Sequence, residues 1–184
     1  KSFNLELKKE DSIIDKDGFF IGGYGLKLVL AKDENKIITA SNELVQDRSS
    51  IRFYDIEKRD VNKYKVLYSN RIVDFHASPK DSLLFLSHKD STIKVYRYGK
   101  KPWYKNLHTI KLNSISRRIN YSNGNIFYIT DKGEVFRFNI SNEETELIEK
   151  IDQPLVNFEI DVKRQKIYAT TINGELIILN TGTA

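Results

Sequence analysis

Apolar and polar residues alternate in short runs along most of the chain, and these runs recur at a nearly constant spacing. Four of them are rich in β-branched and aromatic residues, and they begin at Ile51, Ile93, Val135 and Leu176, which lie 42, 42 and 41 residues apart. Alternation with a period of two predicts half-buried β-strands. The regular spacing predicts a structural repeat of about 42 residues.

The neighbours of these four strands also recur in a fixed order. A polar turn precedes each strand, and in the last two repeats Lys-Gly and Asn-Gly supply the positive φ that a tight hairpin needs. A short apolar strand lies before each turn, and an alternating strand lies earlier still. The short apolar strands cover residues 37–40, 84–87, 126–129 and 167–170. The alternating strands cover residues 26–30, 73–77, 119–121 and 156–160. A fourth strand follows in three repeats, at 64–68, 107–112 and 146–151.

Four antiparallel strands in each repeat of this length are typical of a β-propeller blade. We therefore predict an all-β chain, a β-propeller with four blades. The repeats are expected at residues 26–70, 71–113, 114–152 and 153–184. A meander or sandwich of evenly spaced hairpins is the alternative.

Two segments depart from the repeat near the N-terminus. The middle hairpin of the first repeat has a long polar connection at 41–50, which is expected to be a surface loop. The glycine-rich segment 22–25 lacks a phosphate-binding fingerprint and is expected to form a tight turn into Leu26.

The last repeat ends after its third strand. Residues 1–25 are expected to form an N-terminal strand and a linker, and the alternation of Phe3, Leu5 and Leu7 suits a strand that completes this last blade. The four repeats would then form a closed ring, or they are four consecutive blades of a larger propeller. Because four-bladed rings are uncommon, we favour the larger propeller and expect the chain to be an excerpt.

The blade pattern resembles the WD-repeat family over roughly residues 26–180. Asp90 lies where that family often has a structural turn aspartate, and Asp131 looks similar; Tyr96-Arg97 lies where the Trp-Asp pair would be. The Gly-His pair that usually opens a repeat is missing, and 171–182 also resembles quinoprotein-like propellers. The resemblance implies a scaffold for other macromolecules, since WD-type propellers rarely catalyse.

Composition narrows the classes of function. The chain has 184 residues, of which 40% are apolar and 30% charged, and it contains no cysteine. Disulfides, thiolate metal sites and a cysteine nucleophile are therefore excluded. No apolar run approaches the length of about 18 residues that a transmembrane helix needs, so no membrane partner is expected. The net charge is +5, with no Asp or Glu between 91 and 130 and a largely acidic stretch from 134 to 161.

The basic zone of the second repeat holds the candidate binding residues. Lysines surround the only tryptophan in the loop after the third strand, and two arginines begin the next repeat. The set is Lys100, Lys101, Trp103, Tyr104, Lys105, Arg117 and Arg118. Loop aromatics with cations suit base stacking with phosphate contacts, and they also suit a protein-binding hot spot. The structural alternative is that Trp103 packs beneath its own loop.

No constellation for catalysis or metal binding emerges. His76, His88 and His108 fall on different strands or turns of one repeat, so no metal site and no cofactor is expected. Asp74 and His76 share one side of a strand, an arrangement that can orient a general base, but the chain lacks a nucleophile turn. We expect a hydrogen-bonded structural pair, and a channel-site enzyme is the remaining alternative.

The sequence thus favours a non-catalytic scaffold that contacts protein partners as a subunit of a larger complex. In one version of this hypothesis, the complex acts on nucleic acid. Direct RNA or DNA binding through the basic zone is the rival hypothesis. An intracellular location, in the cytoplasm or nucleus, is expected.

Overall fold

The computed structural model describes residues 23–30, 36–43, 49–55, 60–67, 70–78, 80–98 and 105–181. These residues form fifteen β-strands in four antiparallel sheets. Within this part of the chain there is no helix of the length and apolarity needed to cross a membrane. The all-β class expected from the alternating pattern is confirmed.

Each sheet is built from consecutive strands, which we call blades 1 to 4. Blade 1 contains β1 (Gly23–Leu30), β2 (Lys36–Glu43), β3 (Ser49–Asp55) and β4 (Asp60–Leu67). Blade 2 contains β5 (Ile72–Ser78), β6 (Leu83–His88), β7 (Thr92–Arg97) and β8 (Lys105–Lys111). Blade 3 contains β9 (Ser116–Ser122), β10 (Asn125–Thr130), β11 (Glu134–Asn139) and β12 (Thr145–Lys150). Blade 4 contains β13 (Leu155–Asp161), β14 (Lys166–Thr171) and β15 (Leu176–Asn180).

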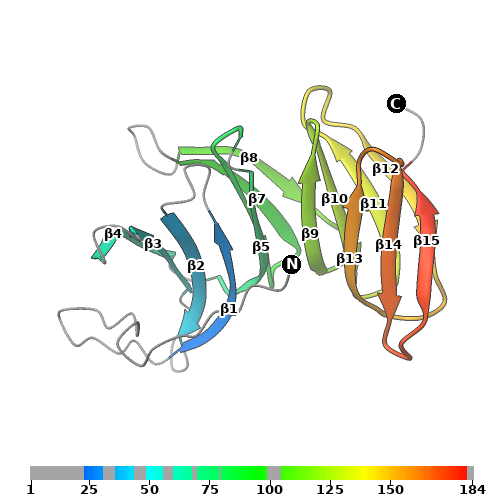
Figure 1. Ribbon diagram of the computed structural model, residues 1–184, viewed down its shortest axis with the longest axis horizontal. Coiled ribbons are helices and arrows are strands. Elements are labelled where there is room, and N and C mark those ends of the chain that lie inside the picture. Colours follow the sequence, from blue (N-terminus) through cyan, green and yellow to red (C-terminus); the bar gives the residue numbers. More distant parts are fainter. Residues whose placement is uncertain are drawn as a thin grey trace, which may run out of the picture.

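The blades follow one another through the molecule, and blades 1 and 4 lie at opposite ends (Figure 1). Within each sheet the strands pair in chain order. The first strand of each blade packs against the first strand of the next, from β1 to β5, β9 and β13. This arrangement matches successive propeller blades, and it contradicts the alternative of one continuous sandwich.

The core lies in three seams between neighbouring blades. Ile38 and Phe53 of blade 1 pack against Phe75 of blade 2 in the first seam. The other face of blade 2, with Phe85, packs against blade 3 in the second seam, and blades 3 and 4 share a third cluster around Phe127. Because side chains of a strand alternate between faces, every inner blade contributes to two seams.

Two expectations for blade 1 are corrected. The connection expected as a loop at 41–50 is partly strand, since Asn42 of β2 pairs with Ser49 of β3. The glycine-rich segment is not a turn throughout, because β1 begins at Gly23, and a register shift lies between Gly25 and Lys27. Glycine tolerates the irregular backbone of such a bulge, which explains a strand where the sequence suggested a turn.

Glycines shape the hairpins of blades 3 and 4, and Gly174 before β15 has the positive φ expected of it. Asn123 and Gly124 both have positive φ, which fits the two-residue hairpin between β9 and β10. Gly133 also has positive φ, and a Cβ at this position would meet the carbonyl oxygen of Ile151 at 2.3 Å. The turn before β11 therefore lies directly against the chain that leads from blade 3 to blade 4.

Candidate functional site

The antiparallel strands separate the hairpins into two rims. The turns between first and second strands, at 80–82, 123–124 and 162–165, lie at one end of the sheets, which we call the groove rim. The turns between second and third strands, at 89–91, 131–133 and 172–175, lie at the other end, the tie rim.

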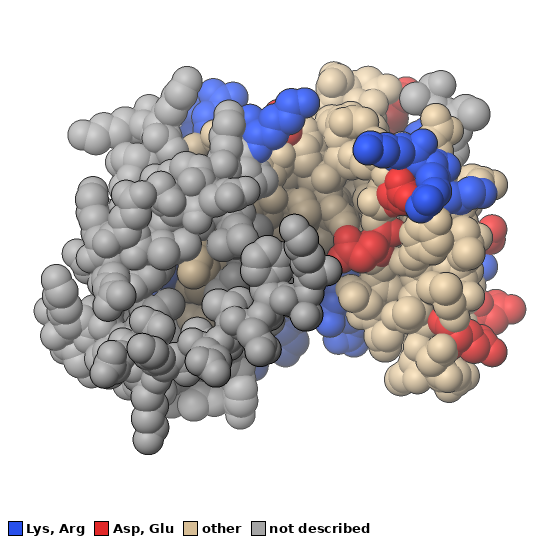
Figure 2. All heavy atoms as spheres, viewed as in Figure 1, with Lys and Arg blue, Asp and Glu red and all other residues tan. Residues whose placement is uncertain are grey.

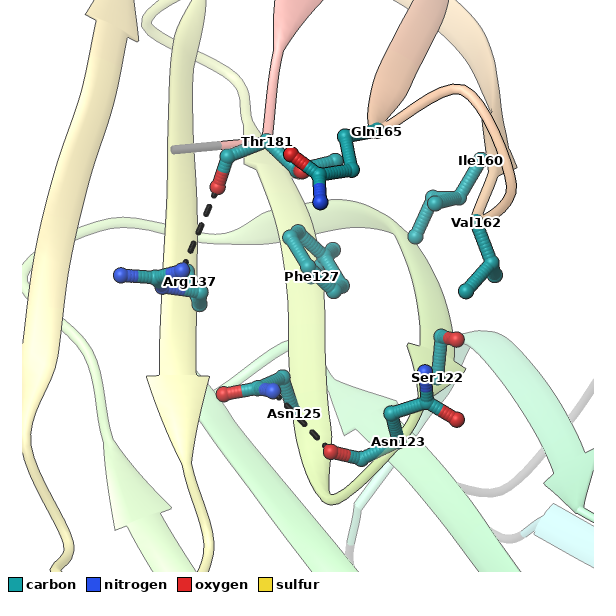
Figure 3. A pocket seen from close by; sticks show the side chains of 9 residues that line it. All are labelled: Ser122, Asn123, Asn125, Phe127, Arg137, Ile160, Val162, Gln165 and Thr181. Carbon is teal, nitrogen blue, oxygen red and sulfur yellow. Dashed lines mark hydrogen bonds between the residues drawn. The ribbon is translucent and has the colours of Figure 1, made fainter. Parts of the chain in front are cut away.

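A groove of about 210 Å³ opens at the groove rim between blades 3 and 4. Figure 3 shows its two walls, one from the β9–β10 hairpin and β11, the other from the β13–β14 hairpin and the residue after β15. The lining residues are Ser122, Asn123, Asn125, Phe127, Arg137, Ile160, Val162, Gln165 and Thr181. Amides and hydroxyls thus surround an apolar floor.

Among the described residues that line this groove, Arg137 is the one charged side chain, and it is paired. Arg137 Nη2 forms an ion pair with the carboxylate of Glu146 on β12, and its Nη1 donates a hydrogen bond to the carbonyl oxygen of Thr181 at 3.3 Å. Asn125 donates from Nδ2 to the carbonyl oxygen of Asn123 at 3.1 Å (Figure 3). The groove therefore offers neutral donors and acceptors beside the ring of Phe127, which suits an extended peptide better than a phosphate.

Buried polar groups close the seam between blades 2 and 3. The Asp74 carboxylate on β5 accepts a hydrogen bond from the backbone N–H of Ile119 at 2.9 Å. Ser87 Oγ on β6 donates to the carbonyl oxygen of Ser116 at 3.0 Å and accepts from the N–H of Asp74 at 3.1 Å. The carboxylate that sequence analysis weighed as a base partner of His76 is thus bonded into the junction of two blades.

In each of blades 2 to 4, one carboxylate at the tie rim accepts side-chain hydrogen bonds. In blade 2, Asp90 accepts hydrogen bonds from Thr92 Oγ1 and Asn70 Nδ2, both at 2.6 Å, so the turn is joined to the connection that enters the blade. Desolvation acts to raise the pKa of Asp90, but these two hydrogen bonds, with smaller contributions from His88 and Lys94, outweigh it and lower the pKa below its ordinary value. The resemblance placed a structural aspartate at this position, and the geometry agrees.

In blades 3 and 4 this carboxylate comes from a glutamate that sequence analysis missed. Glu134 Oε2 accepts from Thr130 Oγ1 at 3.0 Å, and Glu175 Oε2 accepts from Gln153 Nε2 at 3.0 Å. Asp131, which looked equivalent to Asp90, is exposed as Asp90 is, but its carboxylate accepts no such hydrogen bond from the described residues. The missed signal is the repeated pattern Thr-x-x-Gly-Glu at 130–134 and 171–175, in which the threonine hydroxyl accepts the glutamate N–H.

His88 is buried at the end of β6. Burial disfavours the charged imidazolium and, with a smaller contribution from the Lys94 ammonium, lowers the pKa of His88 to about 4. His108 instead lies 3.3 Å from a carboxylate oxygen of Glu143. Across the described ranges, no three His, Cys, Asp or Glu side chains gather into a metal-binding group.

The described members of the basic set do not form one patch. Lys105 begins β8 opposite Arg97, at the groove rim, whereas Arg118 pairs with Ile129 near the start of β9, at the tie rim. Since β8 spans seven residues, the two rims lie about 20 Å apart. Whether Arg117 and Arg118 extend the patch on one face stays a prediction, because only Lys105 of the loop residues in the set is described. Lys100, Lys101, Trp103 and Tyr104 lie outside the described residues.

The surface charge agrees with this separation. On the face seen in Figure 2, basic and acidic side chains of the described residues occur in small mixed groups rather than as one basic stripe.

Comparison with solved structures identifies the architecture. The β-propeller domain of Cps50 (Swd1) from Myceliophteria thermophila is similar with a TM-score of 0.73 and 11% identity, covering 88% of this chain and 55% of that one. The chain has the fold of a WD40-type β-propeller. The WD40 domain of Toxoplasma gondii coronin gives a TM-score of 0.68 at 13% identity, covering 84% of this chain and 42% of that one.

A designed protein is also similar to this propeller. The computationally designed Ika4 protein gives a TM-score of 0.69 at 13% identity, covering 88% of this chain and 93% of the designed one. No family model matches the sequence, and no curated protein matches it. The chain spans about half the length of the Swd1 domain. At these identities the comparisons establish the fold, while function has to be argued from the surfaces of the propeller itself.

Proposed function

We propose that this propeller is a non-catalytic scaffold that binds a segment of a partner protein in the groove between blades 3 and 4, as a subunit of a larger assembly. The observation that carries the proposal is the composition of the groove. Neutral amides and hydroxyls on two facing hairpins can pair with a peptide backbone, and the floor at Phe127 and Ile160 can accept an apolar side chain.

Charge around the groove favours a protein over a nucleic acid. Arg137 is paired with Glu146, and Glu143 and Glu144 are exposed in the groove-rim turn of blade 3. Lys163 and Arg164 are exposed in the groove-rim turn of blade 4, where Arg164 pairs with Asp161. These charges form no continuous basic track for a phosphate backbone, and the acidic turn of blade 3 attracts a basic segment. The proposed ligand is therefore an extended peptide with an apolar anchor and flanking lysine or arginine.

Selection of displayed random peptides on the immobilised chain tests this proposal. We expect enriched peptides with an apolar residue beside basic ones, and at least about tenfold weaker binding to a Val162→Arg variant, because the new side chain fills the groove. Ile172→Arg is the matched control, since Ile172 is an exposed aliphatic residue of the same blade at the tie rim. Peptides that bind Val162→Arg as tightly as the unmodified chain would contradict the groove as the site.

A single-stranded RNA oligonucleotide serves as the opposing probe. The scaffold proposal expects weak RNA binding that an Arg117→Glu/Arg118→Glu variant leaves unchanged. Tight RNA binding that falls steeply with salt and is lost in that double variant would replace the proposal with the nucleic-acid alternative.

A further inference from the structure

The seam between blades 2 and 3 shows how the fold itself fills the place that the groove occupies one seam further on. The ring of Tyr121 on β9 stacks on Phe85 of β6, with 4.6 Å between the ring centroids and 23° between the ring planes. Burial, and then the Asp81 carboxylate that accepts a hydrogen bond from the phenol, raise the pKa of Tyr121 above its ordinary value. Tyr121 thus closes this seam with an aromatic ring and a bonded hydroxyl.

In the seam between blades 3 and 4, the position of Tyr121 is taken by Ile160. Each of these two residues opposes the second residue of the strand that follows it, β10 or β14. Phe85 and Phe127 are likewise the third residues of β6 and β10. Tyr121 packs in the cluster of Phe85, and Ile160 packs in the cluster of Phe127. The second seam therefore keeps the phenylalanine but has an isoleucine in place of the tyrosine.

The exchange of tyrosine for isoleucine leaves space at the groove rim. An isoleucine side chain is shorter than that of tyrosine and has no hydroxyl. Ile160 and Phe127 both line the groove of about 210 Å³ (Figure 3). Phe127 is 4% exposed, so a ligand meets the edge of its ring rather than its face.

A second exchange changes the other side of the same place. Val95 of β7 opposes Phe85, and Arg137 of β11 opposes Phe127 in the same register. Val95 is completely buried, whereas Arg137 lines the groove, on the side of Phe127 away from Ile160 (Figure 3). A guanidinium beside an apolar floor favours an aromatic ring over an aliphatic side chain, because the face of the ring attracts the cation.

The rim of the groove offers acceptors for a hydroxyl where the closed seam has Asp81. They come from the two facing hairpins and are Ser122, Asn123, Asn125 and Gln165. Among the described residues that line the groove there is no carboxylate. A phenol in the groove would therefore bond to neutral amide and hydroxyl oxygens, which satisfy it without placing a charge in the seam.

We propose that the partner segment anchors in the groove through a tyrosine, whose ring packs against Phe127 and Ile160 and whose hydroxyl bonds to the polar groups of the rim. This inference rests on the proposed function, since it names the anchor of the peptide that the groove is proposed to bind. Edge-to-face contacts between aromatic rings are favourable beyond the area that they bury. The fold then uses the same contact twice, within the chain at Tyr121 and with a partner at the groove.

Short synthetic peptides test the anchor on the full chain. They carry two flanking lysines and differ only in the central residue, which is tyrosine, phenylalanine, leucine or alanine, and binding is measured by fluorescence anisotropy. We expect the tyrosine peptide to bind about threefold to tenfold more tightly than the leucine peptide. It should bind about threefold more tightly than the phenylalanine peptide, which lacks the hydroxyl.

The outcomes separate this inference from the proposed function. A leucine or phenylalanine peptide that binds as tightly as the tyrosine peptide, and is weakened by Val162→Arg, overturns the tyrosine anchor and leaves the peptide groove in place. If no peptide binds, or if Val162→Arg leaves binding unchanged, the proposed function fails and the anchor fails with it.

Filling the groove from within tests the equivalence of the two seams. Ile160→Tyr installs the residue of the closed seam, so its ring should occupy the place of the ligand. We expect at least about tenfold weaker binding of the tyrosine peptide, with a urea midpoint no lower than that of the unmodified chain. Val156→Tyr is the matched control, because Val156 is 42% exposed at the tie-rim end of the same strand, and it should leave binding unchanged. Undiminished binding to Ile160→Tyr overturns the inference, and so does a lower urea midpoint, which would show that a tyrosine does not fit there.

Discussion

The seam between blades 2 and 3 and the seam between blades 3 and 4 are built on the same strand pattern, yet they differ at the groove rim. Phe85 and Phe127 occupy equivalent positions on β6 and β10. Phe85 is completely buried beside Tyr121, whose ring stacks on it at 4.6 Å, whereas Phe127 forms the floor of the groove. One seam is filled by an aromatic pair, and the other keeps space for a ligand.

Polar groups reinforce the difference. Asp74 bonds to the N–H of Ile119 inside the first seam, where both groups are buried. Across the second seam, Asn120 donates to Glu159 in an exposed hydrogen bond of 3.3 Å. The repeat therefore reproduces each blade, but the seams between blades differ in their hydrogen bonds. We expect a ligand to bind at the seam that is held least by buried hydrogen bonds.

Truncating the two phenylalanines gives the largest expected effects. Phe85→Ala should lower the free energy of unfolding by about 3–5 kcal/mol, because it leaves a cavity in a closed seam. Phe127→Ala should cost about 2 kcal/mol less than Phe85→Ala, since its site already borders the groove and admits water. Urea denaturation of both variants measures the difference. Equal losses would show that the two seams are packed alike.

Acid should weaken blade 2 more than the other blades. The second strands of blades 2, 3 and 4 end at His88, Thr130 and Thr171, all buried. The pKa of His88 is lowered to about 4 in the folded chain and is about 6.5 when unfolded, so the unfolded state binds more protons between these values. The stability contributed by neutral His88 is fully present above about pH 6.5. About 2–3 kcal/mol of it should be lost as the pH falls to about 4.

His88→Thr, which installs the residue of blades 3 and 4, should flatten this pH dependence. His108→Thr is the control, because His108 lies near the surface beside Glu143 and its removal should leave the acid loss in place. The free energies of unfolding from urea titrations at pH 7 and pH 4.5 give the comparison. A His88→Thr chain that loses as much stability in acid as the unmodified chain would assign the loss to other groups.

Removing a hydrogen bond that joins neighbouring blades should have a smaller effect on stability. Asp74→Ala leaves the buried N–H of Ile119 without its acceptor, which should cost about 1–3 kcal/mol. Asn120→Ala removes an exposed hydrogen bond and should change stability by about 0.5 kcal/mol or less. Thermal unfolding of the two variants separates the cases, and a cost for Asn120→Ala as large as that for Asp74→Ala would remove the contrast between the seams.

The strands and their grouping into blades were predictable because hairpins are local. Alternation, turn glycines and a constant spacing reveal each strand without knowledge of the rest of the chain. The strand predicted to begin at Leu176 is β15, which begins there, and the strand predicted to begin at Ile93 is β7, which begins one residue earlier. Blade 1 was predicted less well, because a strand that contains Gly23 and Gly25 reads as a turn.

The lining of the groove and the placement of Lys105 and Arg117 at different rims could not be predicted in this way. The lining of the groove comes from several separate segments, and its uncharged residues have no distinctive spacing. Lys105 and Arg117 lie close in sequence, but the intervening strand carries the chain from one rim to the other. Residues that are near in sequence can therefore lie at opposite rims, because each β-strand moves the chain by about 3.3 Å per residue.

The smallest expected effect concerns the two turn aspartates that looked alike in the sequence. Asp90→Ala should cost about 1 kcal/mol, because it removes the acceptor for Thr92 and Asn70. Asp131→Ala should change stability by less than about 0.3 kcal/mol, because Glu134 already supplies the carboxylate of that turn. Since both aspartates are exposed, burial cannot explain a difference between the variants. Equal urea midpoints would mean that the hydrogen bonds of Asp90 add nothing to the stability of blade 2. A lower midpoint for Asp90→Ala alone would show that the hydrogen-bonded carboxylate of the turn comes from a different residue in blades 2 and 3.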